Sequence, residues 1–322
     1  MTTATASPIT ERAVAFVAEH KPRAEELGRR LADVIEDPDE FVRVFGEGFT
    51  TLADPVYHEG QRTVVPGLGP THGVRWPLIQ AVIRGFREAT RRERTSTWLF
   101  VADRLFRQPE LEARWFAFGL LDRLVVDDPE RSWQLLRRAA REAGDWATVD
   151  ALAHPVGRGI LLEAYRWAEL DQLVYSPSHW ERRLVGSAVA TIPFVDRQRG
   201  REAIVAERGL GLIGQLIGDD APEVQKALAW ALRSLVLVDK AAVTSFCERE
   251  ARRATADDDG HRAWVVRDTL PKLDDEAANL IRLQLADIRR RPGAPSTSEA
   301  AAAAARFGGD MLGRPIPEPP LT

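Results

Sequence analysis

The chain has 322 residues, of which 44% are hydrophobic and 29% charged, the balance of an ordinary globular protein. Its single cysteine, Cys247, excludes an intramolecular disulfide and a metal site built on several thiolates, and we expect a reducing, cytoplasmic location. No stretch approaches the roughly 18–20 apolar residues that a membrane helix needs, and the N-terminus does not resemble a secretory signal. The formal net charge of −4 argues mildly against a nucleic-acid ligand.

The N-terminal part, residues 1–72, is predicted to form a helical cap followed by a Gly/Pro-rich loop over residues 54–72. Helical periodicity dominates the rest of the chain. In residues 131–143, for example, the apolar side chains fall on one stripe and the arginines on the other face. Residues 224–235 repeat this pattern, whereas runs that alternate with a period of two are scarce. The sequence therefore predicts an all-α protein.

Prolines near the expected first turns divide the helices into pairs. The predicted pairs span residues 74–107, 109–143, 145–174, 177–218, 220–254 and 260–290. Such units bury their apolar faces only by stacking, so we expect an α-α superhelix (solenoid) of HEAT-like pairs over residues 73–290, with a concave groove. Residues 291–322 are expected to be a flexible tail with one short alanine-rich helix.

Two segments of the chain are locally basic, and screening to roughly 8–10 Å at physiological salt makes this local distribution more informative than the net charge. The arginines concerned are Arg84, Arg87, Arg91, Arg92, Arg94, Arg104 and Arg107 in one segment, and Arg182, Arg183, Arg197, Arg199 and Arg201 in the other. A charge run is often only a solvated face, so the distribution permits DNA binding without requiring it.

The segment 144–150 is the most informative one. Asp145 is a favourable N-cap, which places Trp146 and Asp150 one helical turn apart on the same face. Because aspartate is a poor helix-interior residue, Asp150 beside a large aromatic side chain indicates a functional group. The structural alternative is that Trp146 fills the core and Asp150 bonds a neighbouring loop.

Two further stretches carry aromatic and cationic side chains at helical spacing. In the first, Pro177 and Ser178 open a helix on which Trp180 and Arg183 share a face, and the arginine suits either a phosphate or a salt bridge between helices. In the second, Trp230 falls off the apolar stripe of its helix, which favours a groove wall over deep core.

Taken in order, W-x-x-x-D, S-x-x-x-W-x-x-R and K-A-x-x-W-x-L-R resemble the AlkD-like DNA alkylation repair family, whose members are bacterial alkylpurine DNA glycosylases of HEAT-like pairs. The turn Gly73-Val-Arg-Trp-Pro77 is similar to the start of an early helix in that family, and the likeness covers about residues 72–272. Pro222 and Glu223 stand where similar proteins carry aromatic residues, and the section before Gly73 is longer than in compact members.

The resemblance implies an enzyme that removes cationic N3- or N7-alkylpurines from duplex DNA without inserting the base into a closed pocket. Asp150 would be the catalytic carboxylate, with Trp146 and Trp230 against the cationic nucleotide, and Arg183 on the backbone phosphate. We extend the predicted DNA contacts to the neighbouring side chains Arg182, Trp180, Lys226 and Arg233. The same resemblance implies no cofactor and no metal, and we expect a monomer that associates with the nucleoid.

Two other functions remain compatible with these residues. The first is a HEAT-type module that binds DNA or protein without catalysis. Such a module has no need to combine Trp146, Asp150, Arg183 and Trp230, but a resemblance to an enzyme family does not guarantee activity. A glycosylase for bulky natural-product adducts would keep the chemistry and change the substrate. A nucleotide-dependent enzyme is disfavoured because the chain has no P-loop and no G-x-G-x-x-G after a strand.

Overall fold

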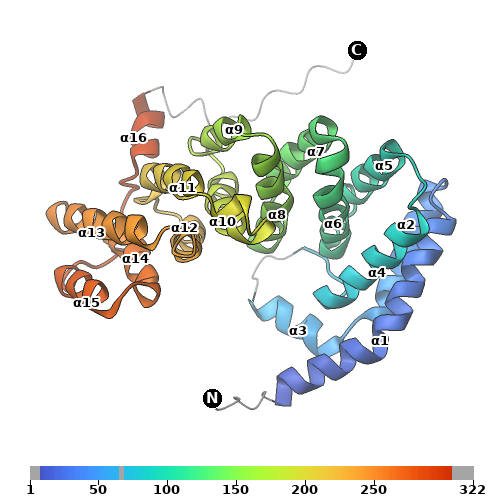
Figure 1. The fold of residues 1–322 in the computed structure, drawn as a ribbon. Coiled ribbons are helices and arrows are strands. Elements are labelled where there is room, and N and C mark those ends of the chain that lie inside the picture. The colour runs from blue at the N-terminus through green and yellow to red at the C-terminus, as the bar shows by residue number, and fades with distance from the viewer. Residues whose placement is uncertain (1–7, 65–68, 307–322) are drawn as a thin grey trace. The chain divides into compact units, whose positions relative to one another are not determined.

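The structure, a computed structural model, describes residues 8–64 and 69–306 (Figure 1). Over these ranges the chain forms helices and no strand, which confirms the all-α prediction. None of the described helices is both long and apolar enough to span a bilayer. Contacts divide the chain into two compact units, residues 1–139 and residues 140–322.

Unit 1 is built around a close helix crossing. It contains α1 (Pro8–Asp33), α2 (Pro38–Leu52), α3 (Pro55–Val64), α4 (Trp76–Ala89), α5 (Thr95–Phe106), α6 (Leu111–Asp127) and most of α7 (Pro129–Glu142). Helix α1 packs along α4, where a Cβ on Gly28 would lie 2.2 Å from the carbonyl oxygen of Val82. Glycine at this position therefore lets the two backbones approach. Phenylalanines from α2, α4 and α6 fill the core beside this crossing.

The predicted loop over residues 54–72 is partly wrong, because residues 55–64 form helix α3. Asp54 explains the helix start: its carboxylate accepts hydrogen bonds from the backbone N–H groups of Val56 and Tyr57, at 3.0 and 3.3 Å. Pro55 then occupies the first helical position, where its missing N–H costs nothing. The Gly/Pro content signalled the turns around this short helix and concealed the helix itself. Residues 65–68 lie outside the described part of the chain.

Unit 2 contains the segments that carry the predicted site. Its helices are α8 (Trp146–Leu162), α9 (Arg166–Leu173), α10 (His179–Val195), α11 (Ala203–Leu216), α12 (Pro222–Leu235), α13 (Lys240–Ala256), α14 (Gly260–Thr269), α15 (Asp275–Gln284) and α16 (Glu299–Arg306), with 3-10 turns η1 (Arg199–Arg201) and η2 (Leu270–Lys272). The six predicted pairs correspond to successive helices from α4–α5 through α14–α15, and their outer boundaries lie within a few residues of the predicted spans.

Helix α10 lies between α8 and α12 and packs extensively on both. Asp150 contacts Arg183 and Ser187, and the later residue Ala153 contacts the later residue Thr191. Because the residue numbers rise together on both helices, α8 and α10 run in the same direction. On the other side, a Cβ on Gly186 would lie 2.9 Å from the Cβ of Ala227, so α10 also approaches α12 closely. The result is that residues near the starts of three helices meet around α10.

The first part of the predicted tail is held against unit 2. The backbone N–H of Thr297 donates to the carbonyl of Gly218 at 2.8 Å, and its hydroxyl donates to Asp259 at 2.5 Å. Helix α16 is the expected alanine-rich helix, and it packs on α11. Residues 307–322 lie outside the described residues, and the predicted domain boundaries stay predictions.

Candidate active site

Helix α8 presents the predicted aspartate and one of the predicted tryptophans. Asp145 caps the helix as expected, because its carboxylate accepts from the backbone N–H of Thr148 at 2.7 Å. Trp146 and Asp150 follow one turn apart, and both are partly exposed. The side chain of Asp150 retains 22% of its accessible surface, so the carboxylate is neither core nor freely solvated.

Helix α10 supplies the groups that hold Asp150. The guanidinium of Arg183 forms a two-point contact with the carboxylate: Nε donates to Oδ1 at 3.1 Å and Nη2 donates to Oδ2 at 2.8 Å. One turn further on, the Ser187 hydroxyl donates to Oδ1 at 2.7 Å. Such charge-assisted pairs fix geometry as well as adding energy, so the carboxylate is held in one orientation by residues more than 30 positions away in sequence.

Arg183 is itself anchored from α12. Its Nη1 donates to the backbone carbonyl of Glu223 at 2.6 Å and lies 3.5 Å from the Glu223 carboxylate. Its Cζ lies 6.0 Å from the centroid of the Trp146 ring, at the outer limit of a cation–π contact. The Arg183 side chain is only 6% exposed. Of the two partners that the sequence allowed for Arg183, the structure shows the salt bridge between helices. Phosphate binding by Arg183 stays a prediction.

Arg182 is occupied by a different set of partners. It donates to Asp219 at 2.6 and 3.3 Å, and to the carbonyls of Ser176 and Pro177 at 2.9 and 3.1 Å. Trp180 is partly exposed and lies beside His179, with ring centroids 4.4 Å apart. Burial, and next the Arg182 guanidinium, lower the pKa of the His179 imidazole. Arg182 thus braces the turn between α11 and α12, and its predicted DNA contact is untested.

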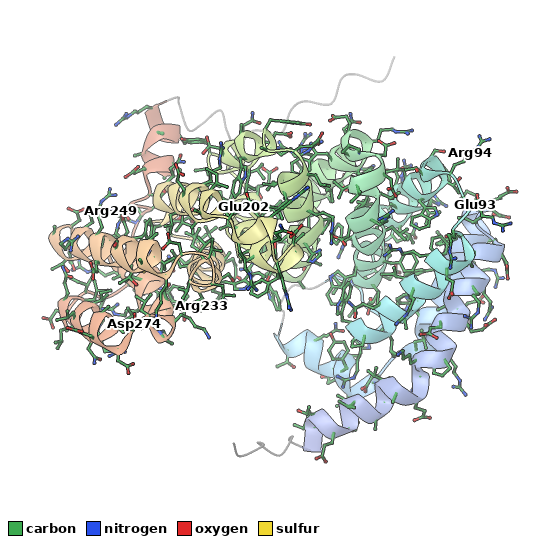
Figure 2. All side chains as sticks on the ribbon, in the orientation of Figure 1. Glu93, Arg94, Glu202, Arg233, Arg249 and Asp274 are labelled. Carbon is green, nitrogen blue, oxygen red and sulfur yellow. The ribbon has the colours of Figure 1, made fainter. Side chains whose placement is uncertain are left out.

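Helix α12 carries the remaining predicted residues along its solvent-facing side. Lys226 is 57% exposed and donates to Glu223 at 3.1 Å. Arg233, labelled in Figure 2, donates to the carboxylate and to the backbone carbonyl of Asp268. Trp230 lies between these two cations along the helix and is partly exposed, whereas the apolar stripe of α12 is fully buried. This agrees with the prediction that Trp230 lies off the stripe. Exposed ion pairs contribute about 0–1 kcal/mol, so these two cations can exchange their partners for phosphates at little cost.

Ser187 and the backbone of Glu223 were not among the predicted site residues. The only sequence signal for Ser187 is its spacing of four residues after Arg183, which places both on one face of α10. Among the described residues no group of three or more histidine, cysteine or acidic side chains could hold a metal ion. What the arrangement can do chemically is to present one fixed, partly exposed carboxylate one helical turn from Trp146.

These features define an all-α protein with an anchored carboxylate, and the comparison with known families is consistent with them. Residues 47–258 match the family model described as DNA alkylation repair enzyme. This match covers most of the chain, so the protein belongs to that family and is an enzyme of DNA alkylation repair that acts on DNA. The match begins in α2, earlier than the predicted likeness, and no curated protein matches the chain.

Proposed function

We propose that the protein is a DNA glycosylase that hydrolyses the N-glycosidic bond of cationic N3- or N7-alkylpurines in duplex DNA. The observation that carries the proposal is the Asp150 carboxylate, which is fixed by two-point contact with Arg183 and yet partly exposed next to Trp146. Membership of a DNA alkylation repair family supports alkylated DNA as the substrate class.

The chemistry requires little more than a well-placed negative charge. An N3- or N7-alkylpurine is already cationic, so it leaves as a neutral base when the bond between C1′ and N9 breaks and the bonding electron pair stays with the purine. Positive charge then develops on the sugar, as in glycoside hydrolysis in general. The Asp150 carboxylate stabilises this charge, and it accepts a hydrogen bond from the water that attacks C1′. The water adds to C1′ and releases one proton.

The aromatic and cationic residues bind and orient the nucleotide. Trp146 and Trp230 present π faces to the cationic base or sugar, each contact contributing about 0.5–2 kcal/mol. Lys226 and Arg233 flank Trp230 in exposed, exchangeable ion pairs, so we assign the phosphate contacts to them first. Such contacts position the duplex and carry no sequence information.

The decisive test is base release from a duplex with one 7-methylguanine, measured under single-turnover conditions for wild type and Asp150→Asn. Loss of one preorganised electrostatic group costs about 10²–10³-fold in rate, so Asp150→Asn is expected to slow release by this factor and to bind the duplex normally. The matched control is Asp259→Asn, which breaks another aspartate–arginine pair of unit 2, with Arg262 at 3.0 Å. It is expected to lower stability and to leave the rate of the folded protein unchanged.

The remaining outcomes separate the rival functions. Equal release by wild type and Asp150→Asn contradicts the role given to Asp150. Binding of the duplex with no release of 7-methylguanine, but with release of a bulky N7 adduct, identifies a glycosylase for large lesions. Binding with no release of either base identifies a non-catalytic binding module.

A further inference from the structure

Ser187 is a fully buried residue of α10 whose only hydroxyl contact among the described residues is Asp150. The hydroxyl donates to Oδ1 at 2.7 Å, the shortest of the three hydrogen bonds to that carboxylate. A buried hydroxyl is costly unless it has a partner, and serine is a poor residue for a helix interior. The hydrogen bond to Asp150 therefore accounts for a serine at position 187, whereas helix propensity does not.

The three donors distinguish the two oxygens of Asp150. An ionised carboxylate offers about four lone-pair sites, two on each oxygen. Oδ1 receives both Nε of Arg183 and the hydroxyl of Ser187, so its two sites are filled. Oδ2 receives only Nη2 of Arg183, and the described residues place no donor on its second site. Because the side chain is partly exposed, this second site is the one that an outside group can reach.

We propose that Ser187 is a positioning residue that fixes the Asp150 carboxylate so that Oδ2 is the oxygen facing the sugar and the attacking water. The proposal rests on the proposed glycosylase function. Without the Ser187 hydroxyl, each oxygen of Asp150 has one free site. A water can then bind to Oδ1, or the carboxylate can rotate away from its orientation. A displacement of about 1 Å in a catalytic group is enough to cost up to 10²-fold in rate, so this second anchor contributes directly to turnover.

The competing explanation is that Ser187 is merely a small residue that lets α8 and α10 approach. The chain offers a matched control one turn further along the same face. The hydroxyl of Thr191 is also buried at this helix contact, but it donates to the backbone carbonyls of Ala153 and Ala188, at 3.1 and 3.0 Å. Thr191→Val removes a hydroxyl from the same interface without touching Asp150. Ser187→Ala removes only the oxygen and keeps the small volume.

The experiment compares wild type, Ser187→Ala, Thr191→Val, Asp150→Asn and the double variant Asp150→Asn/Ser187→Ala. For each, we would measure single-turnover release of 7-methylguanine and the Kd for the same duplex. A lost positioning group is expected to slow Ser187→Ala about 10-fold at unchanged Kd, while Thr191→Val stays within about twofold of wild type, since its hydroxyl acts on backbone only. The double variant is expected to match Asp150→Asn, because Ser187 acts through that carboxylate.

A wild-type rate in Ser187→Ala would overturn the proposal. So would equal losses in Ser187→Ala and Thr191→Val, or effects of Ser187→Ala and Asp150→Asn that multiply in the double variant. Crystal structures of wild type and Ser187→Ala keep this test separate from the proposed function. If wild type releases no base, the glycosylase is wrong, whereas the positioning role is still decided by the carboxylate: it should rotate or occupy two orientations in Ser187→Ala, and an unchanged carboxylate would refute it.

Discussion

Two neighbouring arginines of α10 form the same kind of ion pair with different consequences. Arg182 contacts Asp219 through Nε and Nη2, and Arg183 contacts Asp150 through the same two nitrogens. The Asp219 side chain is 3% exposed and also caps the next turn, accepting from the backbone N–H of Ala221 at 2.9 Å. Each carboxylate thus accepts two hydrogen bonds on one oxygen and one on the other among the described residues, but the Asp150 side chain is 22% exposed.

The difference shows how an ion pair can be closed or open to a ligand without any change of residue type. Every lone pair of a carboxylate that is spent on internal donors is unavailable to a ligand. Asp219 joins a turn to α10, so it holds the fold locally. Asp150 keeps one side toward solvent beside Trp146, so its negative charge can act on a bound nucleotide. Because both carboxylates receive three donors, exposure separates the two sites, and neither the presence of an arginine nor the number of donors does.

The largest expected effect comes from breaking each pair in turn with Arg183→Gln and Asp219→Asn. Removing one member of a buried pair costs about 3–5 kcal/mol of unfolding free energy, and less where the remaining partner is partly exposed. The partners that remain, Arg182 in Asp219→Asn and Asp150 in Arg183→Gln, are 18% and 22% exposed, so we expect the two variants to lose similar amounts of stability. Only Arg183→Gln is expected to slow base release as well, by about 10²-fold, since it frees the carboxylate from its anchor.

Urea unfolding and single-turnover release on the same preparations measure both quantities. The comparison fails if Asp219→Asn slows release as much as Arg183→Gln once both proteins are folded. It also fails if Arg183→Gln releases base at the wild-type rate.

A second, smaller effect concerns the exposed pairs of α12. If Lys226 and Arg233 replace their acidic partners with phosphates, Lys226→Ala and Arg233→Ala should each weaken duplex binding and reduce the slope of log K against log salt by about 1. The control is Arg249→Ala on α13, an exposed arginine paired with Glu250 at 3.1 Å and labelled in Figure 2. Its slope should equal that of wild type. A slope unchanged in both α12 variants would remove these residues from the DNA interface.

A third test concerns the charge of Glu223, whose carboxylate contacts both Arg183 and Lys226. Glu223→Gln keeps the backbone carbonyl that anchors Arg183 and removes a negative charge that opposes phosphates. Exposed pairs are worth about 0.2–1 kcal/mol, so duplex binding should tighten by about 1.4- to 5-fold at low salt and by less at high salt. Asp268→Asn, which releases Arg233, should act in the same direction. Weaker binding in both variants would contradict the exchange of partners.

Most of the fold follows from the sequence, because apolar periodicity and proline positions report on local structure. The six helix pairs were predictable for this reason, as were the Asp145 cap and the off-stripe Trp230. Helix α3 was not, since it has only ten residues and the prolines and glycines on either side of it are typical of turns.

The candidate site was predictable only along each helix. Spacing alone places Trp146 with Asp150, and it places Trp180 and Arg183 on one helix. Whether Arg183 meets a phosphate or Asp150 depends on how α8 and α10 pack, and 33 residues of sequence separate the two partners. Ser187 was missed for the same reason, because nothing nearby in the sequence indicates that its hydroxyl meets a carboxylate 37 residues earlier.

The smallest expected effect is a pH dependence beside the structural pair. The pKa of His179 is lowered by burial and then by Arg182, while Asp219 and Glu223 act in the opposite direction. An unfolded histidine takes up a proton near pH 6.5, but the folded protein resists protonation until lower pH. Below about 6.5 the unfolded state therefore binds more protons, so this residue makes stability fall as the pH falls, down to the folded pKa. Urea unfolding at pH 7.5, 6.5 and 5.5 should give a shallower decline for His179→Gln than for wild type. Parallel declines would show that the imidazole is as freely protonated in the folded chain as in the unfolded one, and that the Arg182 pair leaves its neighbour unaffected.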